Sequence, residues 1–211
     1  TERKRAEQAL RRQTQFVQLL QEVAVTANQA GSAEQALQQA IDQICAHTGW
    51  PIGHVYLPEE QGAMLMPTQI WHLDDPDSAA PFCDQTEALS IARGEGLVGR
   101  VLAERQPLWS MQPGADPQFW RAEAAAAIGI CAGFAFPVLA GAEVVAVLEF
   151  FSTAAAEPDE ALLEVMKHVG TQLGRVIERS RSAEQLERRV ARRTAHLNAL
   201  LELSKELLPA R

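Results

Sequence analysis

Histidines and cysteines are the side chains of this chain best suited to metal binding or nucleophilic chemistry. Its five histidines never lie within a metal-binding spacing such as His-x-x-x-His, and no cysteine stands beside a histidine. The three cysteines, Cys45, Cys83 and Cys131, are far apart and form no Cys-x-x-Cys pair. This pattern favours reduced thiols over a disulfide or zinc framework. We therefore expect no metal site, no catalytic residue and no enzyme activity in this chain.

The cysteines differ in their expected surroundings. Cys131 is predicted within a central strand and Cys45 on the buried side of a helix, both as small core residues. Cys83 is predicted in a looser loop, which makes it the candidate for a redox thiol.

One carboxylate stands where an apolar strand is predicted. Glu149 lies in the run 144–151, VVAVLEFF, whose continuous apolar character indicates a central strand covered on both faces. A carboxylate there must be ion-paired, hydrogen-bonded or exposed. Arg121 or Arg100 is the expected partner. The other polar strand residues expected to point inward are His54, Tyr56 and Cys131.

Charge and hydropathy exclude two classes of partner. The 211 residues carry a net charge of −8, and residues 31–156 hold four basic against fifteen acidic side chains. Phosphate binding needs a basic surface, so nucleic acid is not expected as a partner. No apolar run approaches the ~20 residues that span a bilayer. The polar N-terminus, which starts without Met, favours a cytoplasmic location and a piece of a longer protein.

The order of predicted elements indicates an α+β fold with an antiparallel sheet. Helices are predicted over 2–29 and 33–47, the second opened by a Ser32–Gln35 capping box. Two strands follow, over 50–57 and 64–73, and two more over 129–139 and 143–152. The middle is predicted as a weak helix over 79–92, a short glycine-opened helix, a brief strand over 107–111 and a helix from Asp116–Pro117 to Ala127.

The last quarter of the chain reads as one long helix with a coiled-coil seam. Apolar residues recur there at alternating steps of four and three, and the first helix keeps a similar spacing. A domain of this size cannot cover such a helix, so we expect a homodimer formed through the two long helices. The residues predicted to form its interface are Leu10, Val17, Leu20, Val176, Val190, Leu197 and Leu201.

Three stretches of the sequence resemble a GAF domain: ARGEGLVGRVLAERQPLW, GICAGFAFPVLAGAEVVAVLEFFS and EPDEALLEVMKHVG. The flanks resemble the helix that leaves a PAS domain and the signalling helices of bacterial sensor histidine kinases. The resemblance implies a GAF-like antiparallel sheet with long N- and C-terminal helices packed on one face and extending into a coiled coil. It also implies a linker helix over 1–30, a sensory domain over 31–178 and a coiled-coil signalling helix over 179–211.

The resemblance also implies a small-molecule pocket between the sheet and residues 70–128, with adjacent sensor and output domains in the same protein. Phe134 and Phe136 are expected to form the pocket floor, although aromatic rings more often fill their own core. Cyclic nucleotide and bilin are disfavoured, because residues 31–156 contain no lysine or asparagine and no cysteine precedes a histidine. The identity of any cofactor or ligand stays open. The candidate ligand-binding residues are Trp71, Phe82, Cys83, Trp109, Phe119, Trp120, Cys131 and Phe134.

Three functions remain for such a chain. The first is a sensory or regulatory domain that relays a signal through dimeric helices. The second is a structural spacer that dimerises and binds nothing. The third, which the absence of local catalytic motifs disfavours, is a redox or small-molecule enzyme.

Overall fold

The computed structural model describes residues 2–207, and for residues 2, 5, 6, 8, 9, 184, 185 and 196–207 it describes the backbone alone. The helices are α1 (Glu2–Gln29), α2 (Ala33–Thr48), α3 (Pro76–Glu87), α4 (Gly96–Glu104), α5 (Ala122–Ala127) and α6 (Glu160–Leu207), with a short 3₁₀ helix η1 (Pro113–Ala115). The strands are β1 (Ile52–Pro58), β2 (Met64–Leu73), β3 (Ile91–Ala92), β4 (Leu108–Ser110), β5 (Ala132–Ala140) and β6 (Glu143–Ser152).

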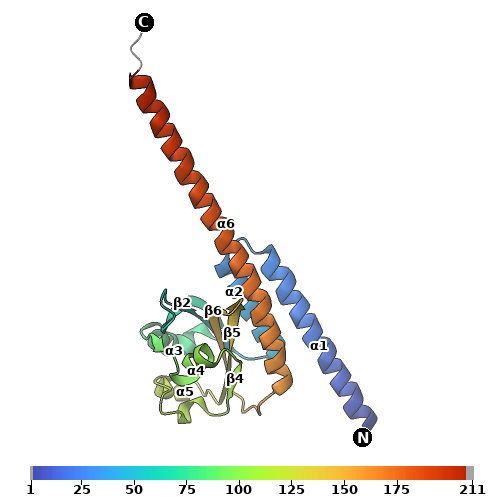
Figure 1. Ribbon diagram of the computed structural model, residues 1–211. Helices are drawn as coiled ribbons and strands as arrows, with labels where there is room; N and C mark the ends of the chain where they lie inside the picture. The colour runs from blue at the N-terminus through green and yellow to red at the C-terminus, as the bar shows by residue number, and fades with distance from the viewer. Residues whose placement is uncertain (1, 208–211) are drawn as a thin grey trace. The chain divides into compact units, whose positions relative to one another are not determined.

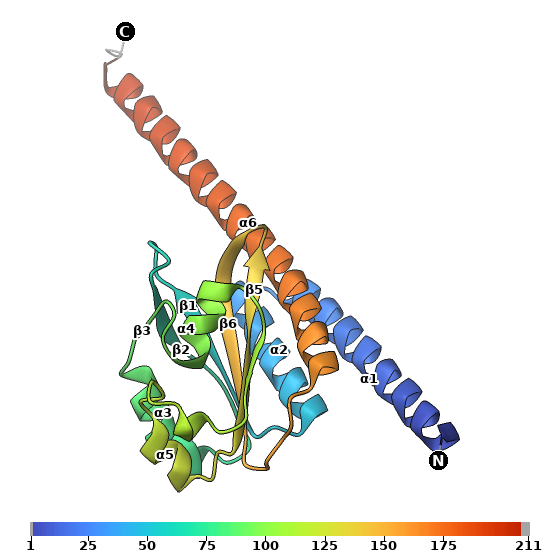
Figure 2. The same ribbon diagram turned by 60° about the horizontal axis from the view of Figure 1, so that its bottom comes forward.

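The strands form one antiparallel sheet in the order β3-β2-β1-β6-β5-β4. Helix α2 and the first part of α6 cover one face, which we call the helix face, and α1 packs on α2. Helices α3, α4 and α5 lie over the other face, which we call the pocket face (Figures 1 and 2). The predicted α+β class with an antiparallel sheet is confirmed.

Local sequence signals set the ends of α2. The Ser32 side chain accepts a hydrogen bond from the Gln35 amide, and the Gln35 side chain accepts one from the Gly31 amide. The helix ends at Gly49, whose φ of 71° is the left-handed conformation that glycine adopts without strain. Its inner side buries Leu37, Ile41 and Ile44 completely or nearly so. The two hydrogen bonds at the start of α2 confirm the capping box predicted from the sequence.

Two glycines allow α6 to lie directly on strand β5. A Cβ atom on Gly170 would overlap the Pro137 carbonyl oxygen, and one on Gly174 would overlap the Leu139 carbonyl oxygen. The sequence presents these glycines as interruptions of a helix, but their role is close approach. Apolar residues of the same helix, from Leu162 to Ile177, complete the core on the helix face.

Helix α1 has two apolar stripes. Leu19, Val23 and Ala27 are buried in the core on the helix face. The stripe that carries the predicted dimer seam is displaced from them and leaves Leu10 65% and Val17 50% exposed. Helix α1 therefore has one apolar stripe that packs inside the chain and a second stripe that is exposed.

The chain divides into two compact units, residues 1–177 and 178–211. The heptad pattern predicts Val176 in the dimer interface. In the structure it belongs to the core of the first unit and is 7% exposed. Leu20 is half-buried against the same core. In the second unit Val190 is 57% exposed. The side chains of Leu197 and Leu201 lie outside the described residues.

The middle of the chain differs most from the prediction. The helix predicted from Asp116 is wrong in its start, because residues 116–121 form turns and α5 begins at Ala122. The helix predicted over 79–92 begins earlier, at Pro76, where the Asp75 carboxylate accepts from the Ser78 amide. Its predicted end is strand β3 instead. Turn-forming Asp and Pro residues are compatible with either a helix start or a loop, which explains the first error.

Gly174→Ala tests the close packing of α6 on β5. Alanine is favoured over glycine inside a helix by ~1 kcal/mol. We nevertheless expect the free energy of unfolding to fall by about 2 kcal/mol or more, because the new methyl group forces the helix off the strand. Chemical denaturation measures the change. Lys167→Ala, on the exposed side of α6, is the matched control and should leave stability within about 0.5 kcal/mol. An equally stable or stabilised Gly174→Ala protein would contradict this packing.

Candidate functional site

A buried ion pair crosses the space between the sheet and the loop before α5. Arg121 Nη1 donates to Glu149 Oε1 at 2.9 Å, and Nη2 donates to Oε2 at 3.0 Å. Glu149 is fully buried on the central strand β6, and Arg121 is 5% exposed. Of the two partners that the sequence offers for this carboxylate, the structure selects Arg121. Bidentate geometry of this kind fixes both the loop and the guanidinium plane.

Aromatic rings and one hydroxyl complete the surroundings of the guanidinium group. Its central carbon lies 4.6 Å from the Phe82 ring centroid, 5.0 Å from that of Phe119 and 5.4 Å from that of Phe151. Arg121 Nη1 also donates to the Thr86 hydroxyl at 2.8 Å. Cation–π contacts are strongest where water is excluded, so these rings stabilise the buried charge.

The electrostatics of the pair follow from burial and mutual attraction. Burial alone would raise the pKa of Glu149, but the Arg121 charge, the nearby His54 imidazole and the hydrogen bonds from Arg121 lower it to about 2. Burial likewise opposes the charge on Arg121, and the Glu149 charge outweighs it, so the pKa of Arg121 is raised. Both groups are therefore ionised at neutral pH, and their charges cancel inside the site. Removing one partner of such a pair costs about 3–5 kcal/mol, because the other charge stays buried.

His54 links the ion pair to the neighbouring strands. Its Nδ1 atom lies 3.4 Å from Glu149 Oε1, and its Nε2 atom lies 3.0 Å from the Thr68 carbonyl oxygen. The imidazole stacks on the Trp71 ring with 3.8 Å between ring centroids. The pairing of β1 with β2 shifts register next to His54, and the Thr68 hydroxyl donates to the Val55 carbonyl there. The row Trp71–His54–Glu149 thus runs across three strands of the pocket face.

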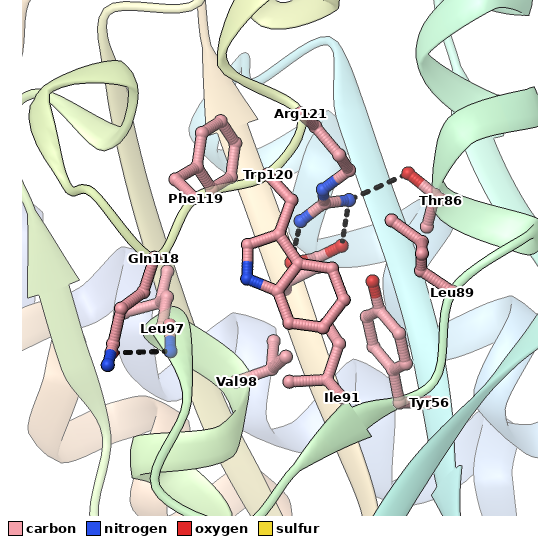
Figure 3. Close-up of a pocket in the computed structure, with 12 residues that line it drawn as sticks. Tyr56, Thr86, Leu89, Ile91, Leu97, Val98, Gln118, Phe119, Trp120 and Arg121 are labelled. Atoms are coloured by element: carbon pink, nitrogen blue, oxygen red, sulfur yellow. Dashed lines mark hydrogen bonds and ion pairs between the residues drawn. The ribbon is translucent and has the colours of Figure 1, made fainter.

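A small cavity lies above this row, between α4, the β3 region and the loop before α5. Its volume is about 20 Å³, room for about one water molecule. Figure 3 shows the Trp120 indole beside the Arg121 guanidinium group, and Trp120 is 47% exposed. Apart from the ion pair, the lining residues are Tyr56, Thr86, Leu89, Ile91, Gly96, Leu97, Val98, Gln118, Phe119 and Trp120.

Tyr56 contributes a polar atom to the cavity that the protein leaves unsatisfied. The residue is fully buried, and its hydroxyl is one of three buried side-chain atoms without a hydrogen bond among those that the structure describes. Burial raises the pKa of Tyr56 well above its usual value, and the nearby Glu149 carboxylate raises it further against the opposing effect of Arg121. The hydroxyl therefore keeps its proton and can act as a donor.

The eight candidate ligand-binding residues of the sequence fall into four places. Phe119 and Trp120 line the cavity. Phe82 belongs to the same core cluster as Phe151, and Trp71 packs against that cluster. Cys83 is half-buried on α3. Trp109 and Phe134 stack on each other in the core of the helix face.

The fourth place holds Cys131, which is exposed just before β5. Its predicted position inside a central strand is therefore wrong, and so is the predicted loop position of Cys83. The expected pocket floor of Phe134 and Phe136 is also wrong, because both rings point to the helix face. Strand alternation decides this, because Gly133 and Ala135, on either side of Phe134, face the pocket side.

Sequence reasoning missed most of the aliphatic lining. Leu97 and Val98 come from the glycine-opened helix, and Leu89 and Ile91 come from the segment around β3. Their apolar character was visible, but nothing in the spacing shows that α4 faces the ion pair. Gly99 is the residue that allows α4 to dock here, because a Cβ atom at this position would overlap the Ala92 carbonyl oxygen and push α4 away.

The protein-family model described as GAF domain matches residues 30–178. The chain belongs to the GAF domain family. A search of the curated proteins finds no match. The match confirms the resemblance of the three sequence stretches to a GAF domain, a family whose members commonly have sensory or regulatory roles.

Solved structures agree on the fold. The GAF domain from a Coxiella burnetii phosphoenolpyruvate-protein phosphotransferase is 14% identical, with a TM-score of 0.67 over 82% of this chain and 98% of that one. The corresponding Acinetobacter domain is 16% identical, with a TM-score of 0.63 over 81% and 97%. Free methionine-R-sulfoxide reductase from Neisseria meningitidis, in complex with its substrate, is 16% identical, with a TM-score of 0.64 over 80% and 91%. At these identities the likeness shows the fold alone.

Further features of this GAF domain bear on its chemistry. Within the described residues, no three His, Cys, Asp or Glu side chains are grouped so as to hold a metal ion. None of the helices that the structure describes is long and apolar enough to cross a membrane. A second, open cleft of about 700 Å³ lies on the helix side, where Trp109, Trp50 and Phe16 face polar residues of the segment before α6.

Glu149→Gln tests the electrostatics through the pH dependence of stability. The carboxylate's stabilising contribution is complete above its ordinary pKa of 4.5 and is lost as pH falls toward about 2. We expect the unfolding free energy of Glu149→Gln to fall less steeply with pH in this window than that of the unchanged protein. Urea denaturation at successive pH values measures the slope.

Glu143→Gln is the matched control, because Glu143 is exposed on the same strand. Its slope should follow that of the unchanged protein. Identical slopes for Glu149→Gln and the unchanged protein between pH 4.5 and 2 would contradict the lowered pKa.

Proposed function

We propose that this chain is a sensory GAF domain of a multi-domain bacterial signal-transduction protein, of the histidine kinase type and located in the cytoplasm. A small molecule binds on the pocket face and changes the packing of α1 and α6 on the helix face. Dimeric helices then relay that change to adjacent domains of the same protein. The observation that carries this proposal is the cavity on β6, with its fully buried and unsatisfied Tyr56 hydroxyl.

Strand β6 supports the coupling because it serves both faces. Glu149 and Phe151 point to the pocket face, while Leu148 and Phe150 belong to the core under α2 and α6. A displacement of the ion pair therefore moves a strand that the helices rest on. At Gly170 and Gly174 the backbone of α6 lies directly against carbonyl groups of β5, so no side chain at these two points could absorb the shift.

A ligand-free spacer is the second candidate, and the small volume of the cavity favours it. About 20 Å³ leaves room for one water molecule and no larger guest. A spacer needs only the helices and the uncovered apolar stripe of α1. The two functions differ in whether occupancy of the pocket reaches the helices.

A redox enzyme has less support, although free methionine-R-sulfoxide reductase shares the fold. Burial, with added repulsion from Glu87 and Asp84, raises the pKa of the Cys83 thiol to about 11. The thiolate is the reactive form, so such a cysteine is a poor nucleophile at neutral pH. Burial also raises the pKa of Cys45.

Val190→Glu tests the dimer. Val190 is exposed within one chain, and we propose that it packs against its copy in a coiled coil. The variant should raise the dimer dissociation constant by at least about tenfold, because two carboxylates then meet at the seam. Ala191→Glu adds the same charge one position along the exposed helix and should have little effect. Sedimentation at micromolar concentration measures both, and a monomeric unchanged protein would contradict the proposed dimer.

Trp120→Gly tests the coupling between pocket and helices. The substitution removes the indole that covers the cavity, and added indole should refill the space. We expect indole to slow amide hydrogen exchange in β6 and in residues 162–177 of α6. The unchanged protein with indole is the control. Slower exchange confined to residues 116–128, with α6 unaffected, would favour the spacer.

A further inference from the structure

The charges of the pocket are already neutralised inside the protein. Both Glu149 oxygens accept from Arg121, and the guanidinium group is enclosed by aromatic rings. The Thr86 hydroxyl accepts from Arg121 and donates to the Phe82 carbonyl oxygen. At the rim, Arg100 lies 3.5 Å from the Asp116 carboxylate. A bound anion would therefore find no uncompensated positive charge among these residues.

Outside the ion-pair cluster, Tyr56 and Gln118 are the polar side chains of the lining, and the Gln118 Oε1 atom already accepts from the Gly96 amide. The Tyr56 hydroxyl is buried, protonated and without a hydrogen bond of normal geometry. Figure 3 shows it on the same side of the cavity as Thr86 and the ion pair. An unsatisfied buried hydroxyl costs free energy, which a single hydrogen-bond acceptor would recover.

The other side chains of the lining are mostly apolar. Leu89, Ile91, Leu97 and Val98 line the same cavity as the Trp120 indole, and Trp120 is half exposed. Trp120 is half exposed, so its indole can turn outward into solvent. A smaller flat ring could then take the place of the indole. Removing the indole would enlarge the cavity to the size of a one-ring compound.

We propose that the pocket binds an uncharged, single-ring aromatic compound that carries one hydrogen-bond acceptor. The ring takes the place of the Trp120 indole, and the acceptor receives the hydrogen bond of the Tyr56 hydroxyl. The proposal rests on the sensory function proposed above and specifies its ligand class. An anionic analogue is rejected, because it would lose its hydration without gaining a counter-ion.

Three matched probes test the ligand class: acetophenone, ethylbenzene and benzoate. They share one ring and a similar size, but only acetophenone is both neutral and an acceptor. Tyr56 is the single tyrosine of the chain, so tyrosine labelled with ¹³C at Cζ gives one resonance. We expect acetophenone to shift this resonance saturably, ethylbenzene to bind about tenfold more weakly without a hydrogen-bond shift, and benzoate to bind least.

Two variants assign the roles of the residues. Tyr56→Phe should weaken acetophenone about tenfold in calorimetric titration and leave ethylbenzene unchanged, because only the hydrogen bond is lost. Trp120→Ala should strengthen the binding of both neutral probes, because no indole must be displaced. Equal unfolding midpoints of Tyr56→Phe and the unchanged protein serve as the control for folding.

The outcomes separate the ligand class from the sensory function. Tighter binding of benzoate than of acetophenone, or an acetophenone affinity that Tyr56→Phe leaves unchanged, overturns the ligand class while the pocket remains a binding site. Absence of binding by all three probes, even to Trp120→Ala, also overturns it. Tight acetophenone binding without any effect on hydrogen exchange in α6 would support the ligand class and contradict the sensory relay.

Discussion

The bidentate ion pair between Arg121 and Glu149 is the interaction on which the pocket face depends. A carboxylate on the central strand of a sheet is stable only with a partner, and the partner comes from a loop without regular structure. The pair therefore fixes the loop that carries Phe119 and Trp120 above the sheet. It also brings the Thr86 end of α3 into the same cluster. A charge inside the core thus ties the loop before α5 and the end of α3 to strand β6.

The same constraint gives the pocket its chemical character. Because the two charges cancel and are hydrogen-bonded to each other, the ion pair adds no net charge to a lining that is otherwise mostly apolar. Among the described residues that line the cavity, Tyr56 is the one with a buried side-chain atom that lacks a hydrogen bond. The helix face follows from different physics, since it is built from aliphatic and aromatic packing and from two glycines that admit α6 to the sheet. Strand β6 joins the two faces, because alternate residues belong to each.

Much of the fold could be predicted from the sequence, and the reasons are local. Strand β6 is fixed by its apolar run, α2 by its capping residues, and the need for a partner of Glu149 by the cost of a buried charge. The pocket lining could not be predicted, because it depends on which face each strand residue takes and on where α4 docks. One residue of offset moved Phe134 and Phe136 from the expected floor to the opposite core. The start of α5 failed for a related reason, since Asp116–Pro117 suits a turn as well as a helix cap.

The central claim is that occupancy of the pocket on one face of the sheet changes the arrangement of dimeric helices on the other. Pulsed electron–electron double resonance between spin labels on Thr194→Cys tests it most directly, in a chain whose Cys83 and Cys131 are replaced by serine. Thr194 is exposed on α6, and in a dimer the two labels report the separation of the helices. The account predicts that acetophenone changes the distance distribution and that Tyr56→Phe reduces this change at equal probe concentration. A dimeric sample whose distribution is the same with and without saturating acetophenone would contradict it.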